Sequence, residues 1–489
     1  MNFRLLPTPR NAQMTGGAVR SSDIGAPKGL HALPAPCQDT ARRWLTGRHG
    51  PLPLRLALDP ALPFEGYSLR VSQQEIAASF SDAPGLGHAL ARLDQLDEKG
   101  AVPCCAIEDS PALPMRGMHF FFANMSHISF DRTLEIIEAM GRWRLNTLVV
   151  EYDERFPYRS HPGIPSPRAF TPEQVQEILT RARSLGMEVI PLHQCLGHVN
   201  FILRNDAYAH IREEDVKRDQ WCPLNPASFD LFRELADEII ETHRPTRYFH
   251  IGGDEARRLG QCPRCAAAAR TQGAGGLYVE FITRAAEHIK KAGLRPIVWD
   301  DMLCHHINVL DRLPRDITLM YWDYWHTRHP SAHFVARPAG RGHVTDKRWD
   351  TEWRAELDPV ERRTLDVFAP RLDLAKDLPA HMLERFRPYL GDEFPKRVRA
   401  FPYLEYYQDQ GFEVICAPTA SGNGSDWRGM PDFPRYSRNI ETFAFRARQA
   451  KAAGLVTTMW YPMPWEAYLP GVMYTGQFAW GAAPSTSRA

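Results

Sequence analysis

The pattern of apolar and polar positions changes near Arg116. Beyond it, short and nearly continuous apolar runs alternate with segments whose apolar residues recur at helical spacing. The runs predict strands at 117–123, 147–152, 188–193, 248–252, 296–300, 317–322, 413–417 and 456–461, with helices at 133–143, 172–185, 229–242, 277–291 and 440–453. Such alternation predicts an α/β fold of the (β/α)8 or TIM-barrel type. An open doubly wound sheet is the alternative, but no glycine-rich nucleotide loop follows any strand.

The residues before Arg116 have a different pattern. Residues 1–50 are rich in Pro, Gly, Arg and Ser and show no sustained period. Alternation predicts strands at 52–58 and 67–72, and leucines at helical spacing predict a helix over 85–96. We therefore expect a small N-terminal α+β domain over residues 1–114, followed by the barrel over residues 115–489.

One stretch of the barrel is too long for a simple loop. Residues 328–399, after the sixth predicted strand, are charged and helical in character, and they predict a helical insertion. Insertions at this end of a barrel strand lie on the face that carries active sites. The segment is therefore expected either to wall a substrate site or to form a solvated helical excursion.

Composition narrows the classes of function. The 489 residues are 44% hydrophobic and 24% charged, and the formal net charge is +1, so no overall attraction to nucleic acid or an anionic membrane is expected. No apolar run reaches the length of about 18 residues that a membrane span needs. The N-terminus lacks the pattern of a secretory signal peptide, and the nine cysteines are too sparse for a disulfide scaffold. These features predict a cytoplasmic protein with reduced thiols.

Two adjacent carboxylates follow the fourth predicted barrel strand, in the stretch His250-Ile251-Gly252-Gly253-Asp254-Glu255. The reacting groups of a barrel lie at the carboxyl ends of its strands. Two neighbouring carboxylates repel each other, which raises the proton affinity of one and suits a general acid. The alternative is that Asp254 caps the next helix and Glu255 faces water. The position at a strand end, after two glycines, favours catalysis.

This motif resembles the signature of glycoside hydrolase family 20, the β-N-acetylhexosaminidases. Further stretches resemble the family's small N-terminal domain and its entry into the barrel, at residues 5–9, 65–69, 107–111 and 114–117. Residues 148–158, LVVEYDERFPY, most resemble the hexosaminidase D branch. The likeness thus extends over nearly the whole chain.

The resemblance implies a substrate-assisted mechanism. Glu255 would match the general acid that protonates the glycosidic oxygen, while the substrate's own 2-acetamido oxygen attacks the anomeric carbon to give an oxazolinium ion. Asp254 would orient the acetamido group and stabilise its developing positive charge, and Glu255 would then act as a base on water, with net retention. A nucleophile that is already bound has a high effective concentration. A carboxylate beside a developing cation stabilises it in a dry site.

The resemblance also implies a wider substrate site. Arg116 would bind the sugar hydroxyls O3 and O4, with a buried structural ion pair as its alternative role. His198 would support the acid. Trp299, Trp322 and Trp460 would form an aromatic cage around the acetamido methyl group and the sugar face, with barrel core as their alternative role.

Two positions depart from the family pattern, and a third, Glu466, matches it only approximately. Gln194 stands where the family often has an aspartate four residues before the histidine, which alters the charge relay behind the acid. Residues 417–425 lack the tyrosine that holds the acetamido oxygen, and Tyr324, Tyr321 or the insertion is expected to replace it. Glu466, after the eighth strand, would accept hydrogen bonds from O4 or O6.

A pair of cysteines, Cys262 and Cys265, follows the acid motif. Two cysteines at this spacing are half of a zinc site. Cys304, with His305 and His306, would supply the rest, because the fourth and fifth strands are neighbours. The favoured alternative is a pair of reduced loop cysteines, so that neither a cofactor nor a resident metal is expected.

The resemblance implies an exo-acting, retaining β-N-acetylhexosaminidase. Its substrate is expected to be an oligosaccharide or glycoside that ends in β-linked GlcNAc or GalNAc, with no nucleic acid and no membrane as partner, and a homodimer is compatible with the sequence. One alternative is a non-catalytic amino-sugar-binding protein on the same barrel, which has no need for an acid. Another is a two-carboxylate glycosidase of a different family, which needs a second carboxylate about 5 Å from Glu255.

Overall fold

The computed structural model describes residues 5–27, 29–123, 128–328, 344–366, 371–396, 401–422, 431–460 and 465–481. The chain divides into two compact units. The first comprises Met1–Arg116, Arg142–Arg144 and the stretch from Gly476 onward, and the second comprises Gly117–Gly141 and Leu145–Thr475. Among the described helices, none has the combined length and apolar character that a bilayer crossing requires.

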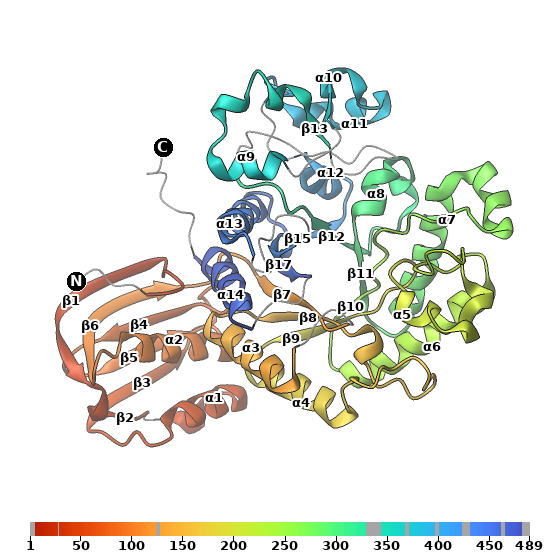
Figure 1. The fold of residues 1–489 in the computed structure, drawn as a ribbon. Coiled ribbons are helices and arrows are strands. Elements are labelled where there is room, and N and C mark those ends of the chain that lie inside the picture. Colours follow the sequence, from red (N-terminus) through yellow and green to blue (C-terminus); the bar gives the residue numbers. More distant parts are fainter. Residues whose placement is uncertain are drawn as a thin grey trace. The chain divides into compact units, whose positions relative to one another are not determined.

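The first unit is a six-stranded sheet in the order β1-β6-β4-β5-β3-β2, packed with α1 and α2 (Figure 1). Its elements are β1 (Asn11–Arg20), β2 (Ile24–Pro27), α1 (Ala35–Leu45), β3 (Leu52–Leu58), β4 (Tyr67–Val71), β5 (Ile76–Phe80), α2 (Ala83–Leu96) and β6 (Ala101–Asp109). The carboxylate of Asp82 caps α2 by accepting a hydrogen bond from the Gly85 N–H. Leu86, Leu90 and Leu93 share one face of this helix and are buried in the core of the unit.

The sequence pattern misses part of this sheet. The expected strands at 52–58 and 67–72 and the helix at 85–96 are present as β3, β4 and α2, but β1, β2 and α1 also lie within residues 1–50. β1 is an edge strand that is exposed at nearly every position. Because neither of its faces is buried, no alternation of apolar residues marks it.

The second unit is a closed barrel of parallel strands (Figure 1). Within the described residues its eight strands are β7 (Met115–Phe121), β8 (Thr147–Glu151), β9 (Glu188–Leu192), β10 (Tyr248–His250), β11 (Arg295–Trp299), β12 (Thr318–Trp322), β15 (Glu413–Ala417) and β17 (Gly454–Met459). β17 closes the ring because it pairs with both β15 and β7, and the short β16 (Thr419–Ser421) adds to it. The predicted TIM barrel is confirmed, and the open doubly wound sheet is wrong.

Burial explains the continuous apolar runs of the barrel strands. Every residue of β8 and of β12 is buried, as expected for parallel strands covered by helices. The main covering helices are α3 (Phe130–Arg142), α4 (Pro172–Ser184), α6 (Pro226–His243), α7 (Pro263–Lys291) and α13 (Phe433–Gln449). Local signals define their starts: Thr171 and Gln174 form a capping box on α4, and Asn225 caps α6. α7 is longer than predicted because two helical segments join across a kink at Gly273.

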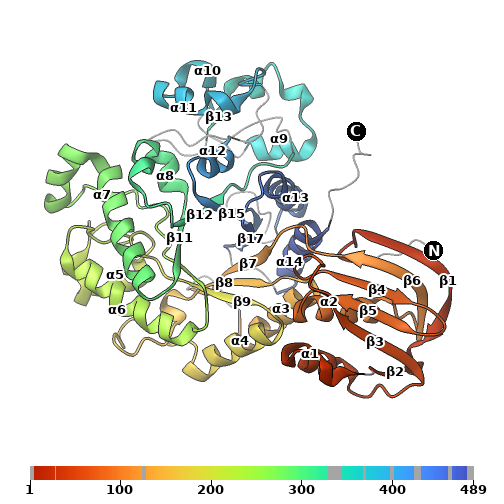
Figure 2. The same ribbon diagram turned by 180° about the vertical axis from the view of Figure 1, so that it is seen from behind.

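The described residues between β12 and β15 form short helices and a two-stranded sheet. They comprise β13 (Thr345–Asp346), α9 (Pro359–Asp366), β14 (Arg371–Leu372), α10 (Leu374–Asp377) and α11 (Ala380–Leu390), followed by α12 (Tyr403–Asp409). Figure 2 shows α9, α10 and α11 gathered on the side of the barrel that carries α12 and α13. α9 packs on α13 and α11 packs on α12. A role of this insertion in walling a substrate site stays a prediction.

Candidate active site

The Asp254–Glu255 pair lies just beyond the carboxyl end of β10. Two glycines make this turn sterically possible. Gly252 and Gly253 both have left-handed backbone, with φ of 63° and 87°. A Cβ on Gly252 would lie 2.0 Å from Gln194 Oε1, so a side chain there would collide with the neighbouring strand end. The backbone thus turns tightly over the barrel and presents the two carboxylates at its active-site end.

His198 bridges the two carboxylates. Its Nε2 lies 3.3 Å from Asp254 Oδ2 and 3.5 Å from Glu255 Oε2. Burial lowers the pKa of His198, but the attraction of Asp254 and Glu255 outweighs burial and holds the pKa well above its usual value. The two carboxylates therefore favour the protonated imidazole, which lies between the two residues predicted to act on the substrate.

Strained backbone occurs at His198, at Glu255 and at Asp153, which follows β8. Asp153, His198 and Glu255 are non-glycine residues in the left-handed region, with φ of 47°, 54° and 47°. Such conformations cost about 1–3 kcal/mol each and persist only where the surrounding structure enforces them. Glu255 is held by Asp301, whose Oδ2 accepts its N–H at 2.9 Å, and by Arg257, whose Nη2 lies 2.7 Å from Glu255 Oε1. Strain concentrated in this way is typical of active sites.

Asp153 adds a further carboxylate, which the sequence analysis did not select. It follows β8, is 5% exposed, and its Oδ1 has no hydrogen-bond partner among the described residues. Burial first, and then the charges of Glu151 and Glu154, raise the pKa of Asp153 well above its usual value, against the attraction of His198. The signal that would have found it is its place directly after a barrel strand, which also marks Asp301 after β11.

Gln194, one of the two departures from the family pattern, has a defined structural role. Its Nε2 donates to Glu151 Oε1 at 2.9 Å, and its Oε1 accepts the Gly253 N–H at 3.1 Å. The other oxygen of Glu151 lies 3.0 Å from His119 Nε2. An aspartate at position 194 would face Glu151 with a like charge and would have no N–H to donate. The amide therefore positions the backbone that precedes Asp254.

The predicted aromatic residues come together beside this pair. Trp460 Nε1 donates to the Tyr324 hydroxyl at 2.6 Å, and ring centroids are 5.8 Å apart for Trp299 and Trp460 and 4.9 Å apart for Trp322 and Tyr324. Asp301 links this group to Glu255, because Trp322 Nε1 lies 3.5 Å from Asp301 Oδ1. Trp299 is fully buried and Trp460 is half-buried. The contact of these rings with a sugar stays a prediction.

Of the two tyrosines proposed for the acetamido oxygen, only Tyr324 lies in this aromatic group. Tyr321 is buried in β12, its hydroxyl lies 3.4 Å from Arg446 Nη1, and its ring stacks on Phe443 of α13. It therefore points toward the covering helices and away from the pair. Residues 423–425, part of the segment without a tyrosine, lie outside the described residues.

Arg116 occupies a different environment from the expected one. It is fully buried at the amino-terminal end of β7, where its guanidinium contacts the carboxylate of Glu65 and donates to the carbonyls of Leu113 and Arg144 at 3.0 Å. The Asp254–Glu255 pair, by contrast, follows the carboxyl end of a strand. The structure thus places Arg116 in a structural ion pair, the alternative role, instead of in contact with sugar hydroxyls.

Glu466 is exposed in the first turn of α14 (Trp465–Trp480). Within the described part of the chain, no hydrogen bond or ion pair joins it to Asp254 or Glu255, and residues 461–464 before it are outside that part. Its contact with O4 or O6 of a sugar stays a prediction.

Cys304 does not join Cys262 and Cys265. It lies in α8 (Asp301–His305), where its Sγ is 3.1 Å from Asp300 Oδ2 and 3.1 Å from the Tyr407 hydroxyl. The alternative zinc site of the sequence analysis is therefore wrong in its third cysteine. The neighbouring-strand argument fails because the Cys304 thiol contacts Tyr407 of α12 instead.

One family model matches part of the chain. Residues 139–337 match the model of the glycosyl hydrolase family 20 catalytic domain. The matched range contains Asp153, His198, Asp254, Glu255 and Trp322, and it ends before Trp460 and Glu466.

Two curated relatives are similar over the same part of the chain. Hexosaminidase D from Bos taurus is 30% identical over 197 residues, which cover 39% of this chain and 56% of the bovine protein. Hexosaminidase D from Homo sapiens is 32% identical over 200 residues, which cover 39% of this chain and 40% of the human protein. The matches therefore span about half of the relatives' lengths.

Solved structures extend the likeness of fold to the whole chain. A β-N-acetylhexosaminidase from Bacteroides fragilis NCTC 9343 superposes with a TM-score of 0.68 at 17% identity, covering 99% of this chain and 92% of that one. A family 20 exo-β-N-acetylglucosaminidase from Vibrio harveyi, solved with N-acetylglucosamine, gives a TM-score of 0.67 at 17% identity, covering 98% and 73%. At 17% identity these structures show a shared fold. The family model and the hexosaminidase D relatives show that residues 139–337 are similar to the catalytic domain of glycosyl hydrolase family 20.

Proposed function

We propose that this protein is an exo-acting β-N-acetylhexosaminidase that removes terminal β-linked GlcNAc or GalNAc with retention, through an oxazolinium intermediate. One observation carries the proposal. The Asp254–Glu255 pair lies at the carboxyl end of a barrel strand, and Asp301 connects its backbone to the aromatic group of Trp322 and Tyr324. A carboxylate pair beside aromatic faces suits an acetamido sugar, which has an apolar methyl group and a polar amide.

In the first proposed step, Glu255 donates its proton to the glycosidic oxygen as the bond to the anomeric carbon breaks. The acetamido oxygen of the same sugar forms a bond to that carbon, so that positive charge develops on the oxazolinium ring. Asp254, 7% exposed, would lie beside this charge with an Oδ1 that has no partner among the described residues. A fixed negative charge in a buried site stabilises such a cation without reorganising solvent.

In the second step, the Glu255 carboxylate takes a proton from water, the water oxygen bonds to the anomeric carbon, and the bond to the acetamido oxygen breaks. The two inversions give net retention, and Glu255 regains its proton. His198 lies between both carboxylates, and in its protonated form it would balance their charge through the cycle. Tyr324 is the proposed partner of the acetamido oxygen.

Two assays test this proposal. Nitrophenyl β-GlcNAc and β-GalNAc should be hydrolysed, while the matching glucoside and galactoside, which lack the acetamido nucleophile, should be turned over negligibly. A thiazoline mimic of the intermediate should bind far more tightly than the product sugar. Comparable cleavage of plain glucosides would contradict the assignment.

The alternatives predict different results. A non-catalytic sugar-binding protein would bind GlcNAc but hydrolyse neither nitrophenyl substrate. A two-carboxylate glycosidase would be labelled covalently on Asp or Glu by a fluorosugar trap, whereas a substrate-assisted enzyme leaves no such adduct. The cytoplasmic location and the homodimer stay predictions.

A further inference from the structure

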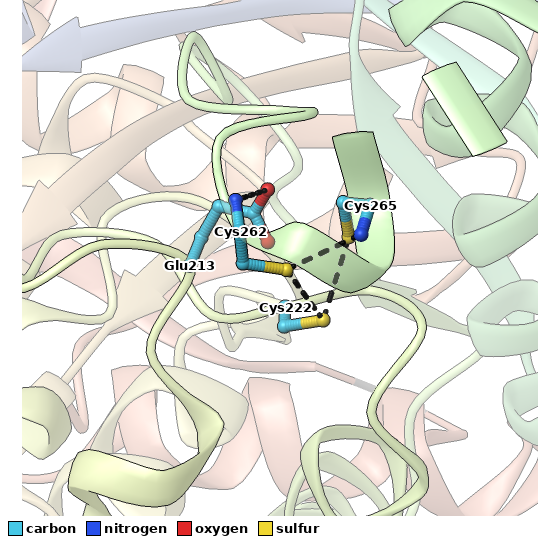
Figure 3. Close-up of side chains that lie close together, drawn as sticks. All are labelled: Glu213, Cys222, Cys262 and Cys265. Atoms are coloured by element: carbon cyan, nitrogen blue, oxygen red, sulfur yellow. Dashed lines mark hydrogen bonds between the residues drawn. The ribbon is translucent and has the colours of Figure 1, made fainter. Parts of the chain in front are cut away.

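Cys262 and Cys265, which follow the Asp254–Glu255 motif in the sequence, lie beside two residues that the sequence analysis did not select. Glu213 and Cys222, from the segment between β9 and β10, converge with Cys262 and Cys265 at the start of α7. One ligand atom from each of the four side chains lies within 4.8 Å of all the others. Figure 3 shows the three sulfur atoms facing one another, with the Glu213 carboxylate beside Cys262.

The distances suit a tetrahedral ion. Cys222 Sγ lies 3.4 Å from Cys265 Sγ and 3.5 Å from Cys262 Sγ. Thiolates bound to one zinc ion at about 2.3 Å are separated by about 3.8 Å, and disulfide sulfurs by only about 2.05 Å. The Cys265 N–H donates to Cys262 Sγ at 3.3 Å, a hydrogen bond that stabilises a sulfur carrying negative charge.

Glu213 provides a second, independent observation. It is 2% exposed, and its Oε1 accepts the N–H groups of Gly260, Gln261 and Cys262 at 3.0, 2.8 and 3.1 Å. Its Oε2 is buried without a hydrogen-bond partner among the described residues, and no Lys, Arg or His of that part of the chain forms an ion pair with it. A buried carboxylate oxygen without a partner is costly, and a cation among the three sulfurs would satisfy it.

We propose that Glu213, Cys222, Cys262 and Cys265 bind one structural zinc ion. Three sulfurs and one oxygen from the protein close the coordination shell, so the site is structural and leaves no position for a substrate. The segments that supply Cys262 and Cys222 are both connected to the proposed catalytic residues. Cys262 ends the loop that begins at Glu255, and Trp221, the neighbour of Cys222, donates to the Cys195 carbonyl at 2.7 Å, three residues before His198. The zinc ion would therefore fix both loops that carry the proposed acid and its histidine.

The test uses the full chain without a metal-binding tag, expressed with zinc in the medium and purified under reducing conditions. Elemental analysis should find about one zinc per chain, and chelation should lower the melting temperature. Cys222→Ser and Glu213→Gln should lose most of the metal, while the matched controls Cys104→Ser and Glu214→Gln, a buried cysteine of the first unit and the neighbouring glutamate, should retain it. Protein without metal, or Cys222→Ser with the zinc content of the wild type, would overturn the proposal.

A spectroscopic measurement covers the case in which the Cys222→Ser variant does not fold. Replacing the ion with cobalt(II) in the wild type should give thiolate-to-metal charge-transfer absorption together with the ligand-field bands of a tetrahedral site. Cobalt that binds without thiolate absorption would contradict the assignment. So would a disulfide between two of these cysteines in protein whose thiols were alkylated at lysis.

Discussion

Two buried clusters of charge in this chain are built in opposite ways. In the first unit, Asp109 is 5% exposed; in the barrel, Asp153 and Asp254 are 5% and 7% exposed. Burial is therefore the same, but hydrogen bonding is not. Asp109 accepts hydrogen bonds with both oxygens, whereas the Oδ1 atoms of Asp153 and Asp254 have no partner among the described residues.

The surroundings of Asp109 come entirely from the first unit. Its donors are the Tyr67 hydroxyl, Arg92 Nη2, Arg144 Nη1 and Trp480 Nε1 on Oδ2, and the N–H groups of Arg10 and Ser110 on Oδ1. A carboxylate whose lone pairs are all taken by its own chain stabilises the fold and has nothing left for a ligand. The Oδ1 atoms of Asp153 and Asp254 have no such partner among the described residues, so they keep hydrogen-bonding capacity that a ligand could use.

The largest expected effect is on stability, at Asp109. Asp109→Asn removes the charge that compensates Arg92 and Arg144, both almost fully buried, and should lower the free energy of unfolding by about 3–5 kcal/mol. Urea unfolding measures this change. Asp94→Asn, which loses a more exposed ion pair with Arg48 in the same unit, should cost less than about 1 kcal/mol. Equal losses for the two variants would remove the contrast between the buried cluster and the surface.

The next effect is on catalysis, at Glu255. Glu255→Gln cannot donate a proton and should lower kcat/KM by about 10²-fold or more on substrates with poor leaving groups. On a nitrophenyl glycoside, whose leaving group needs little protonation, the loss should be smaller. Steady-state kinetics on both substrates check this, and equal losses would count against Glu255 as the acid.

A smaller effect is expected at Tyr324. Tyr324→Phe removes the hydroxyl that accepts from Trp460 and is proposed to hold the acetamido oxygen, so kcat on a GlcNAc substrate should fall about tenfold, the equivalent of one hydrogen bond. Tyr321→Phe serves as the control, because the hydroxyl that it removes points toward α13 and away from the pair. It should leave kcat unchanged. A fall in kcat for Tyr321→Phe alone would reverse the assignment of the two tyrosines.

The smallest effect is on the pH dependence of stability, at His198. Because the folded-state pKa of His198 is raised above its unfolded value of about 6.5, protonation stabilises the fold below that value, and this stabilisation is lost as pH rises through the folded pKa. The unfolding free energy of the wild type relative to His198→Gln should therefore decrease from pH 6 toward alkaline pH. If the difference in unfolding free energy between the wild type and His198→Gln increased with pH, the imidazole would be neutral in the fold.

The barrel was predictable because each of its strands is buried on both faces. The apolar run at 148–150 therefore stands out in the sequence without any alternation. The exposed edge strand β1 gave no such signal. Position relative to a strand end was also sufficient to select Asp254 and Glu255, and the same rule applied to β8 and β11 would have added Asp153 and Asp301.

What sequence could not provide is the direction in which side chains point. Arg116 lies in β7 and Cys304 lies in α8, just after β11. Arg116 bonds Glu65, whereas Cys304 bonds Asp300 and Tyr407. Cys222 and Glu213 are about 40 to 50 residues away from Cys262, so only the folded chain reveals the four-residue cluster. Spacing motifs find local pairs such as Cys262 and Cys265, and tertiary contacts complete them.

The most direct measurement compares Asp254→Asn with the wild type in kinetics and unfolding. Asparagine keeps the shape of the side chain but removes the negative charge beside the developing oxazolinium, so kcat on a GlcNAc substrate should fall by about 10²-fold. KM should change little, because the cation exists only near the transition state. The free energy of unfolding should fall far less than in Asp109→Asn. A change in KM alone, or a loss of stability as large as that of Asp109→Asn with kcat preserved, would show that Asp254 is a structural residue.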